Sequence, residues 1–266
     1  MRRFWWPEEK EESKTFYHEN GYAVFSGVML PFVCDWINAL YRAVADEDFA
    51  PILNHDRKNQ AIQDTVMRDR TVVWIIEYLT GSEMVGCQTY FLFKEPGTRY
   101  AKQEWVPHQD NSYPQAEPGA YLAVAISLCD QDAESGGLFI YPGTHKLGLL
   151  PFDPKVSYRE AEGEKPGNEV ILPDSVRLSD KTVNGGHPFS ARATFSDNTK
   201  RDITVYDKMD ISLRKGDAMV FSGDLIHGSY ANTSQRPRPM VITNYLRKGA
   251  NMIEGATAKR MRIELR

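Results

Sequence analysis

The spacing of apolar residues along the chain changes character near Met84. Before it, apolar residues recur at helical intervals, as in PFVCDWINALYRAVAD, which opens with Pro31. Residues three and four apart share one face of a helix, and proline is favoured at a first helical position. Residues 9–48 are therefore predicted to be mostly helical, with a β-rich run at 22–29. The first helix is expected to end at Gly21, and another helix is expected over about 62–82.

From Met84 onward, the helical spacing gives way to short runs of β-branched and aromatic residues. These runs are bounded by Gly, Pro, Asn and Asp, and they read MVGCQTYFLFK, YLAVAISLC, GGLFIYPG, GDAMVFSG and PMVITNYL. Short strands with such turn residues are typical of sandwiches and barrels. The chain, residues 1–266, is predicted to be one domain in which helices precede a β-core.

A polar stretch at residues 151–210 interrupts the series of strands. It carries Gly and Pro, and it is too long for a structureless loop inside a compact domain. We therefore predict a long insertion with some strand content, for instance at RDITVYD. We also expect this insertion to form a lid or wall that contributes to substrate specificity.

Composition narrows the function classes. The chain has 266 residues, 41% hydrophobic and 26% charged, with a net charge of −4, which is typical of a soluble globular protein. Without a net positive charge, sequence-independent binding of nucleic acid is not expected. The 3 cysteines are scattered, which favours free thiols in a reducing compartment. No apolar run approaches the roughly 18 residues of a spanning helix. We expect a cytoplasmic protein without membrane contact, with Trp5 and Trp6 packed on the domain.

The candidate metal ligands are His108 and Asp110 in WVPHQDN and His227 in FSGDLIHGSY. Alternate residues of an extended segment project to the same side, so His108 and Asp110 can reach one ion. A neighbouring strand can add His227. Two imidazoles and one carboxylate are the ligand set of non-haem Fe(II) sites with open positions. The His-x-Asp pattern alone is weak evidence, and its combination with a distal histidine on strand-like flanks is much stronger.

A basic residue downstream adds to this interpretation. A 2-oxo acid chelating the metal needs a cation for its far carboxylate, and arginine binds carboxylates with two parallel hydrogen bonds. Arg238 lies 11 residues after His227, beyond the turn NTSQRP, and Arg236 lies nine residues after it. The two arginines have the same parity, so strand alternation does not choose between them.

Several segments together resemble the phytanoyl-CoA dioxygenase family of Fe(II)/2-oxoglutarate oxygenases. They are FYHENGYAVFSGVM, FLFKEPG, WVPHQDNSY, DAESGGLFIYPGTHKLG and GDAMVFSGDLIHGSYANTSQRPR. The resemblance supports a mainly β fold, a double-stranded β-helix (jelly roll, cupin-like) with flanking N-terminal helices. It implies that His108, Asp110 and His227 bind the catalytic iron, and that Arg238 rather than Arg236 binds 2-oxoglutarate.

The resemblance also suggests further residues at the cosubstrate. Ser229 matches a position that contacts it. Gln88 and Lys94 share one face of their strand, and similar positions in the family face the cosubstrate pocket, although an outward-facing polar pair is the alternative. Trp105 is a candidate wall of the same pocket, with simple packing as its alternative.

Fewer residues can be assigned to substrate binding than to the cosubstrate. Tyr113 is a candidate substrate contact, and Ala125 stands where many members carry Trp, which suggests extra room near the metal. Met240 replaces a Ser seen in many 2-oxoglutarate enzymes, so Ser229 or another hydroxyl must supply that bond. Because Asp110 is retained, the resemblance argues against halogenation.

The sequence around the remaining histidines and one further arginine gives less support for a role in the site. His145 in PGTHKLG is expected to serve a turn, and His187 and Arg192 are expected to be exposed residues of the insertion. His18 and His55 have no supporting context.

The resemblance implies a dioxygenase that hydroxylates an unactivated C–H bond of a small molecule. Fe(II) would be its cofactor, O₂ and 2-oxoglutarate its cosubstrates, and succinate a product. Desaturation, cyclisation or epimerisation on the same scaffold is one alternative. A non-catalytic cupin-like metal-binding protein is a second. A zinc or manganese hydrolase is a third, but it leaves Arg238 unexplained. The oligomeric state and the substrate stay open.

Overall fold

The computed structural model describes residues 1–53, 60–155, 166–182, 190–194, 200–255 and 259–266. Its α-helices are α1 (Lys10–Asn20), α2 (Pro31–Arg42), α3 (Gln60–Met67) and α4 (Arg70–Thr80). The first helix ends as predicted, because Gly21 adopts φ +80° and its N–H donates to the Tyr17 carbonyl at 2.7 Å.

The single helix predicted over 62–82 is wrong, since the structure has two helices there. The Asp69 carboxylate accepts from the backbone N–H groups of Thr71 and Val72, both at 2.9 Å. This is an N-cap, and it starts α4 as a separate helix. The apolar spacing runs on through both helices and hides the break.

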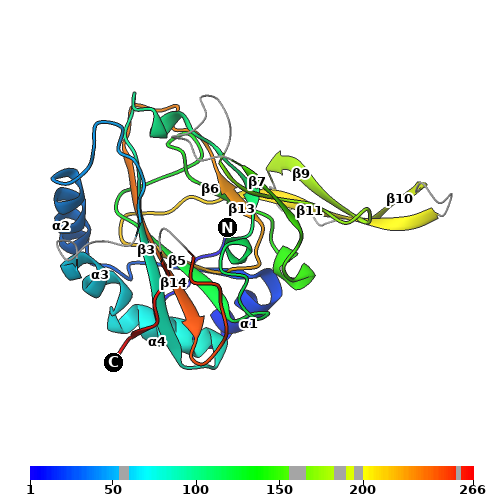
Figure 1. Ribbon diagram of the computed structural model, residues 1–266, viewed down its shortest axis with the longest axis horizontal. Helices are drawn as coiled ribbons and strands as arrows, with labels where there is room; N and C mark the ends of the chain where they lie inside the picture. Colours follow the sequence, from blue (N-terminus) through cyan, green and yellow to red (C-terminus); the bar gives the residue numbers. More distant parts are fainter. Residues whose placement is uncertain (54–59, 156–165, 183–189, 195–199, 256–258) are drawn as a thin grey trace.

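Two β-sheets face one another, as the predicted double-stranded β-helix requires (Figure 1). The first sheet has the order β1 (Tyr22–Phe25), β12 (Ala218–Ser222), β5 (Tyr121–Ser127), β14 (Arg238–Arg247), β3 (Met84–Lys94) and β15 (Ile263–Glu264), with β2 (Ile52–Leu53) also on β3. The second sheet has the order β10 (Ser190–Thr194), β11 (Lys200–Asp210), β6 (Leu138–Ile140), β13 (His227–Ser229), β4 (Trp105–His108), β8 (Gly167–Val170) and β7 (Phe152–Lys155), with β9 (Val176–Thr182) on β11. The mainly β, jelly-roll prediction is confirmed.

The first sheet has apolar side chains on both faces. Ile37 of α2 and Ile76 of α4 belong to the cluster that packs on its outer face. Ala125 and Met240 point inward and pack with Ile140 of the second sheet. A sheet buried on both faces reads as a continuous apolar run, which explains why YLAVAISL shows no alternation.

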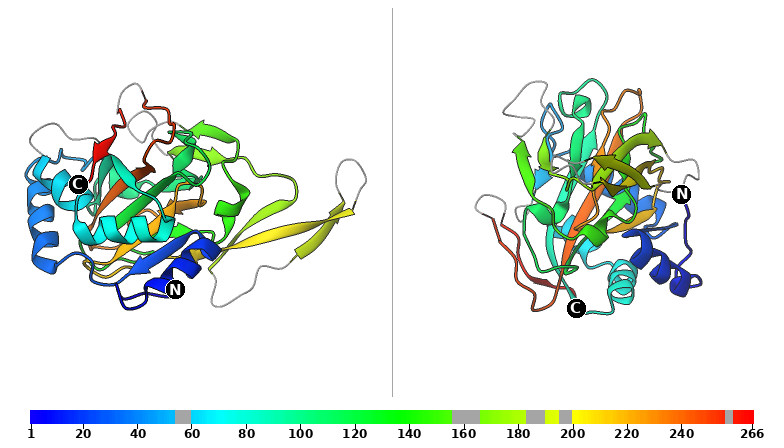
Figure 2. Two further views of the ribbon diagram at one scale, coloured as in Figure 1. Left: turned by 90° about the horizontal axis from the view of Figure 1, so that it is seen from below. Right: turned by 90° about the vertical axis from the view of Figure 1, so that its right-hand side faces the viewer.

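Strands occupy much of the predicted insertion, and RDITVYD lies within β11 as expected. β7 and β8 extend the second sheet beside β4, whereas β9, β10 and β11 form an arm that projects from the body (Figures 1 and 2). Within the described part of the insertion, β8 therefore lies beside His108, whose register neighbour is Glu169. The single domain with an insertion at 151–210 stays a prediction.

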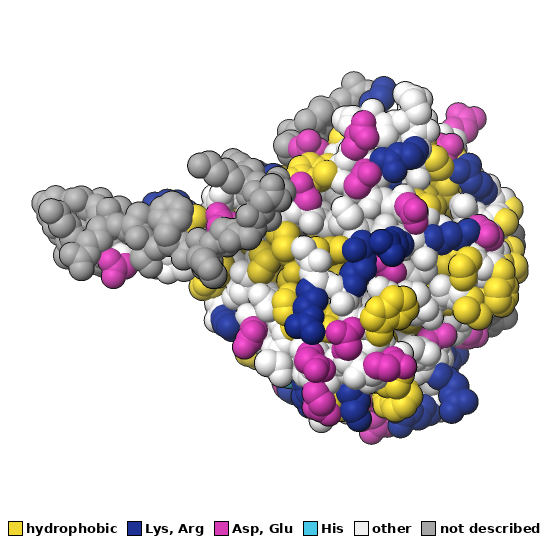
Figure 3. Space-filling model, turned by 180° about the vertical axis from the view of Figure 1, so that it is seen from behind, with side chains coloured by type: hydrophobic (Ala, Val, Ile, Leu, Met, Phe, Trp, Pro, Cys, Tyr) yellow, Lys and Arg dark blue, Asp and Glu magenta, His cyan; other side chains and the backbone are white. Residues whose placement is uncertain are grey.

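The surface expectations have mixed outcomes. Trp6 packs edge-on against Trp74 at 5.4 Å between ring centroids, but Trp5 is 62% exposed, so the packing prediction holds only for Trp6. All three cysteines are free. Basic and acidic side chains are interspersed on the face shown in Figure 3. Among the described helices, none has the length and apolarity needed to cross a bilayer.

Candidate metal centre

The two histidines lie on adjacent antiparallel strands. His108 is the last residue of β4 and His227 the first of β13, and the two are register partners. Their ring centroids are 4.4 Å apart. The pairing of the strands therefore brings together two imidazoles that are far apart in the sequence.

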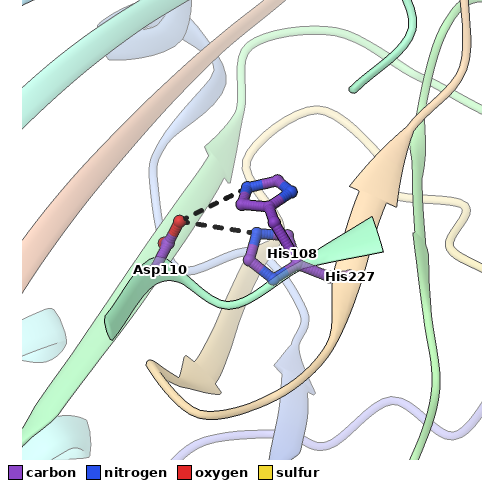
Figure 4. A group of neighbouring side chains, drawn as sticks. All are labelled: His108, Asp110 and His227. Carbon is purple, nitrogen blue, oxygen red and sulfur yellow. Dashed lines mark ion pairs between the residues drawn. The ribbon is translucent and has the colours of Figure 1, made fainter. Parts of the chain in front are cut away.

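Asp110 completes the group from the loop after β4. It begins the 3₁₀ helix η3 (Asp110–Ser112) and so is not part of the strand, as His108 is. The intervening Gln109 is extended, with φ −113° and ψ 129°, so Asp110 returns to the side of His108. One carboxylate oxygen lies 3.7 Å from Nε2 of His108 and 3.6 Å from Nε2 of His227 (Figure 4).

Backbone carbonyls fix both imidazoles in one tautomer. Nδ1 of His108 lies 2.7 Å from the Val106 carbonyl, and Nδ1 of His227 lies 3.0 Å from the Leu225 carbonyl. A carbonyl only accepts, so each Nδ1 carries a proton, and a neutral ring in this tautomer presents the lone pair of its Nε2. Burial, with repulsion from His227 second, lowers the pKa of His108 to about 4, so this ring is neutral near pH 7.

The three side chains fit a divalent metal ion. Ligand bonds of about 2.0–2.2 Å allow one ion to bridge atoms separated by the observed 3.6 and 3.7 Å. The donor set of two imidazoles and one carboxylate suits Fe(II) and leaves coordination positions free. Within the described ranges, this is the one group of His, Cys, Asp or Glu side chains close enough to hold a metal. Its role as a metal site stays a prediction.

Gln109 anchors the loop that carries Asp110. Its side chain is fully buried, donates to the Asp224 carbonyl at 2.6 Å and accepts from Leu150 N–H at 2.8 Å. These bonds hold the segment between His108 and Asp110 in place. A glutamine inside HQD carries no pattern that would mark this role in the sequence.

Gly228 allows the strand with His227 to approach β4. A Cβ atom there would lie 2.4 Å from Phe139 Cζ and 2.6 Å from the Trp105 carbonyl oxygen. Both distances are too short for real contacts. The glycine in HGS is therefore required by the close packing of β13, which bears directly on the position of His227.

Two buried cationic side chains, which we call the cationic pocket, lie at one end of the interior between the sheets. Arg238 is fully buried at the start of β14, opposite Lys94 of β3. Its Nε and Nη1 have no hydrogen-bond partner in the described part of the chain, and burial lowers its pKa. Lys94 donates to the Gln103 carbonyl at 2.9 Å, to Ser229 Oγ at 3.0 Å and to the Tyr230 carbonyl.

Buried cations without paired charges are costly, so this pocket suits an anion. Burial, and after it the positive charge of Arg238, lowers the pKa of Lys94. Arg236 is exposed instead and binds both oxygens of Asp132 at 3.0 and 2.8 Å. Arg236 lies in the turn before β14. The alternation of side chains along a strand therefore does not apply to it, and parity could not separate it from Arg238.

The outward-facing alternative for Gln88 and Lys94 is wrong, because both are buried, at 1% and 0% exposure. Six residues of strand separate them, which is about 20 Å. Gln88 accepts from the Tyr90 hydroxyl at 2.5 Å and is the register neighbour of Asn244. It therefore lies far along β3 from Arg238.

The other predicted residues surround the histidines. The Trp105 ring lies 5.8 Å from the His108 ring, and its Nε1 is buried without a partner in the described ranges. The Tyr113 ring lies 6.4 Å from His108, and its hydroxyl accepts from Asn168 N–H of β8 at 3.2 Å. Ala125 is fully buried on the inner face of β5. Their functional roles stay predictions.

The remaining histidines lie elsewhere or cannot be placed. Nε2 of His145 lies 3.1 Å from the His18 carbonyl, as fits a turn. His55 and His187 lie outside the described residues, as does the side chain of Arg192 in β10.

Sequence reasoning missed two polar residues on the inner side of the sheet, Asn244 and Arg260. Asn244 is fully buried, and neither its Nδ2 nor its Oδ1 has a partner among the described residues. It follows Arg238, Met240 and Ile242 at alternate positions of β14, so strand parity could have found it. Arg260 comes from the C-terminal segment, and no sequence pattern predicts where that segment packs.

Comparisons with known proteins bear on the family and on the fold. The profile of the family "Phytanoyl-CoA dioxygenase (PhyH)" matches residues 17–240. A phytanoyl-CoA dioxygenase of Arabidopsis thaliana is 29% identical over 151 residues, which covers 57% of this chain and 40% of that protein. The matched part thus spans less than half of that relative. An ectoine dioxygenase of Nocardia farcinica is 23% identical over 266 residues, covering 89% of this chain and 78% of that protein.

Solved structures share the fold at low identity. The epimerase SnoN, in complex with Fe3+, alpha ketoglutarate and nogalamycin RO, has a TM-score of 0.63 at 19% identity and covers 98% of this chain and 96% of its own. EvdO2 from Micromonospora carbonacea var. aurantiaca, complexed with 2-oxoglutarate, has a TM-score of 0.60 at 14% identity, covering 92% and 93%. At these identities the likeness establishes the fold.

Proposed function

We propose a function for this chain from one premise, that it belongs to the phytanoyl-CoA dioxygenase family, whose profile covers residues 17–240. The proposed function is that of an Fe(II)- and 2-oxoglutarate-dependent dioxygenase acting on a small molecule. One observation carries it. The two Nε2 atoms and the Asp110 carboxylate converge on one point, in the same interior that buries Arg238, whose Nε and Nη1 have no partner among the described residues.

Iron, 2-oxoglutarate and O₂ supply the oxidation when bound, with succinate and CO₂ as products of the oxo acid. In this proposal His108, Asp110 and His227 hold one face of the ion. The Val106 and Leu225 carbonyls keep the imidazoles oriented by accepting their Nδ1 protons. The chain thus fixes the tautomers before any ligand arrives.

Arg238 would bind the far carboxylate of 2-oxoglutarate through its unpartnered Nε–H and Nη1–H. Ser229 would add a hydroxyl, with Lys94 holding its Oγ at 3.0 Å. Met240 and Ala125 line the inner face of the first sheet between Arg238 and the rest of the interior, and they exclude water from it. This division of roles leaves Gln88 outside the cosubstrate pocket.

We propose hydroxylation of a C–H bond as the outcome. Two observations support an oxygenase with an intact carboxylate ligand, namely the presence of Asp110 and the relatives named dioxygenases. Desaturation, cyclisation or epimerisation would use the same residues and differ only in how the substrate is placed. The mass of the product distinguishes them, because hydroxylation adds one oxygen atom.

The experiment measures succinate release with Fe(II), 2-oxoglutarate and O₂ across a metabolite panel. Anaerobic binding of Fe(II) and 2-oxoglutarate is followed in parallel by their charge-transfer absorption. We expect His108→Ala and Asp110→Ala to lose both signals, and the Arg236→Gln control to keep both. Unchanged turnover in His108→Ala would contradict the proposal. Cosubstrate binding with no O₂ consumption for any compound would favour the non-catalytic metal-binding protein.

A further inference from the structure

Asn244 is a buried amide whose hydrogen bonds are not satisfied by the protein. Its side chain is fully buried, and both Nδ2 and Oδ1 lack partners within the described ranges. Buried polar groups in proteins are almost always hydrogen-bonded, because leaving them unpaired costs their full desolvation. It lies on the inner face of β14, opposite Gln88 on β3 and Ala123 on β5. An unpaired donor and acceptor on this face therefore indicate a ligand.

The C-terminal segment brings Arg260 to the same end of the sheet. Met261 N–H donates to the Cys87 carbonyl at 3.0 Å, and Ile263 of β15 pairs with Gly86. Cys87 directly precedes Gln88, the register neighbour of Asn244. The backbone next to Arg260 is thus fixed to β3 within one residue of that pair.

The hydrogen-bond partners of the Arg260 guanidinium are neutral groups. Nη1 donates to the carbonyls of Ile253 and Glu254, both at the long distance of 3.4 Å, and Nε is buried without a partner in the described residues. Its side chain contacts the Tyr121 hydroxyl, which in turn contacts Tyr90. No carboxylate of the described residues forms an ion pair with it.

The metal centre lies within electrostatic range of this arginine. The carboxylate of Asp110 interacts electrostatically with Arg260, and also with Tyr90 and Tyr113. Asp110 is committed to the metal in the proposed function, so it does not neutralise the guanidinium. Arg260 therefore has no carboxylate of its own among the described residues.

We propose that Arg260 and Asn244 bind an anionic oxygen group of the substrate, a carboxylate or a phosphate. The Nε–H of Arg260 and the Nδ2–H of Asn244 donate to it, and Asn244 Oδ1 accepts from a hydroxyl or N–H next to it. This inference rests on the proposed function and names its substrate class. Asn244 lies six residues along β14 from Arg238, about 20 Å. One molecule of 2-oxoglutarate cannot span both sites, so the second site is left for the substrate.

The test uses the full chain loaded with Zn(II) and saturated with 2-oxoglutarate, so that Arg238 is occupied and no turnover occurs. Benzoate, benzamide and methyl phosphate are titrated in turn. Binding is followed by the NMR signal of Arg260 Nε–H, which is assigned by its loss in Arg260→Gln. We expect benzoate or methyl phosphate to shift this signal saturably and benzamide to leave it unchanged. The stronger of the two anions identifies the carboxylate or phosphate class.

Matched variants test whether anion binding depends on this site or only on the positive charge of the C-terminal segment. Asn244→Leu should weaken anion binding about tenfold or more, whereas Arg262→Gln, an exposed arginine of the same segment, should not. An equal response to benzamide, or no saturable shift with either anion, overturns the proposal. Binding of 2-oxoglutarate in the same samples reports on the dioxygenase function separately. A protein that binds 2-oxoglutarate but no second anion refutes only the Arg260 site.

Discussion

Arg238→Met should make the ligand-free protein no less stable, and it should abolish the stabilisation that 2-oxoglutarate gives. The wild-type guanidinium is fully buried, with Nε and Nη1 unpartnered in the described residues and with Lys94 opposite it. An uncompensated buried charge destabilises the folded state, and methionine fills a similar volume without charge. Loss of a charged residue from the core is normally destabilising, so the expected sign is unusual.

The magnitude follows from linkage. A ligand at 100 times its Kd stabilises the folded state by about 2.7 kcal/mol. At about 2–4 °C per kcal/mol for a chain of this size, wild-type Tm should rise by roughly 5–10 °C. Without two charge-assisted hydrogen bonds worth about 1.5–3 kcal/mol each, the variant should bind at least 100-fold more weakly and show almost no rise at the same concentration.

Thermal unfolding with and without 2-oxoglutarate, in the presence of Zn(II), measures both effects. Arg236→Met is the matched control, because it removes only an exposed ion pair with Asp132 and should keep the full ligand shift. A full shift in Arg238→Met, or its loss in Arg236→Met, would refute the assignment of the cosubstrate carboxylate. A fall of several kcal/mol in the ligand-free stability of Arg238→Met would refute the claim that the charge is unpaired.

Three further predictions concern His108 and residues near the metal centre. The pKa of His108 in the folded protein lies near 4, below its unfolded value. The metal-free protein should therefore lose about 3 kcal/mol of stability as pH falls from about 6.5 to 4. Urea unfolding measures this loss, and the free energy of unfolding should depend less on pH in His108→Gln. Gly228→Ala should cost about 1–3 kcal/mol in urea unfolding and weaken Co(II) binding, because its Cβ would lie 2.6 Å from the Trp105 carbonyl; unchanged metal affinity would show that β13 can shift freely. Tyr113→Phe should speed hydrogen exchange at Asn168 N–H, which loses its acceptor, without altering Co(II) affinity.

The residue pattern alone was sufficient to predict the strands of the core and the end of the first helix. β3 begins at Met84 and ends at Lys94, as the run MVGCQTYFLFK indicates, and Gly21 ends α1. Such features depend on local propensity and short-range spacing, which one segment carries by itself. The break between α3 and α4 was missed because Asp69 acts as a cap only in its folded geometry, while the apolar period continues across it.

The histidine and aspartate candidates were also found in the sequence, since their types and order limit the chemistry they can perform. Sequence alone could not choose Arg238 over Arg236 by parity, because it does not state where β14 begins. It gave no sign of Arg260, whose place depends on the pairing of the C-terminal segment with β3. Pairing between distant segments is decided by which surfaces the folded chain buries together. The tertiary structure therefore determined which charges are left unpaired in the interior, and with them the two sites proposed for anions.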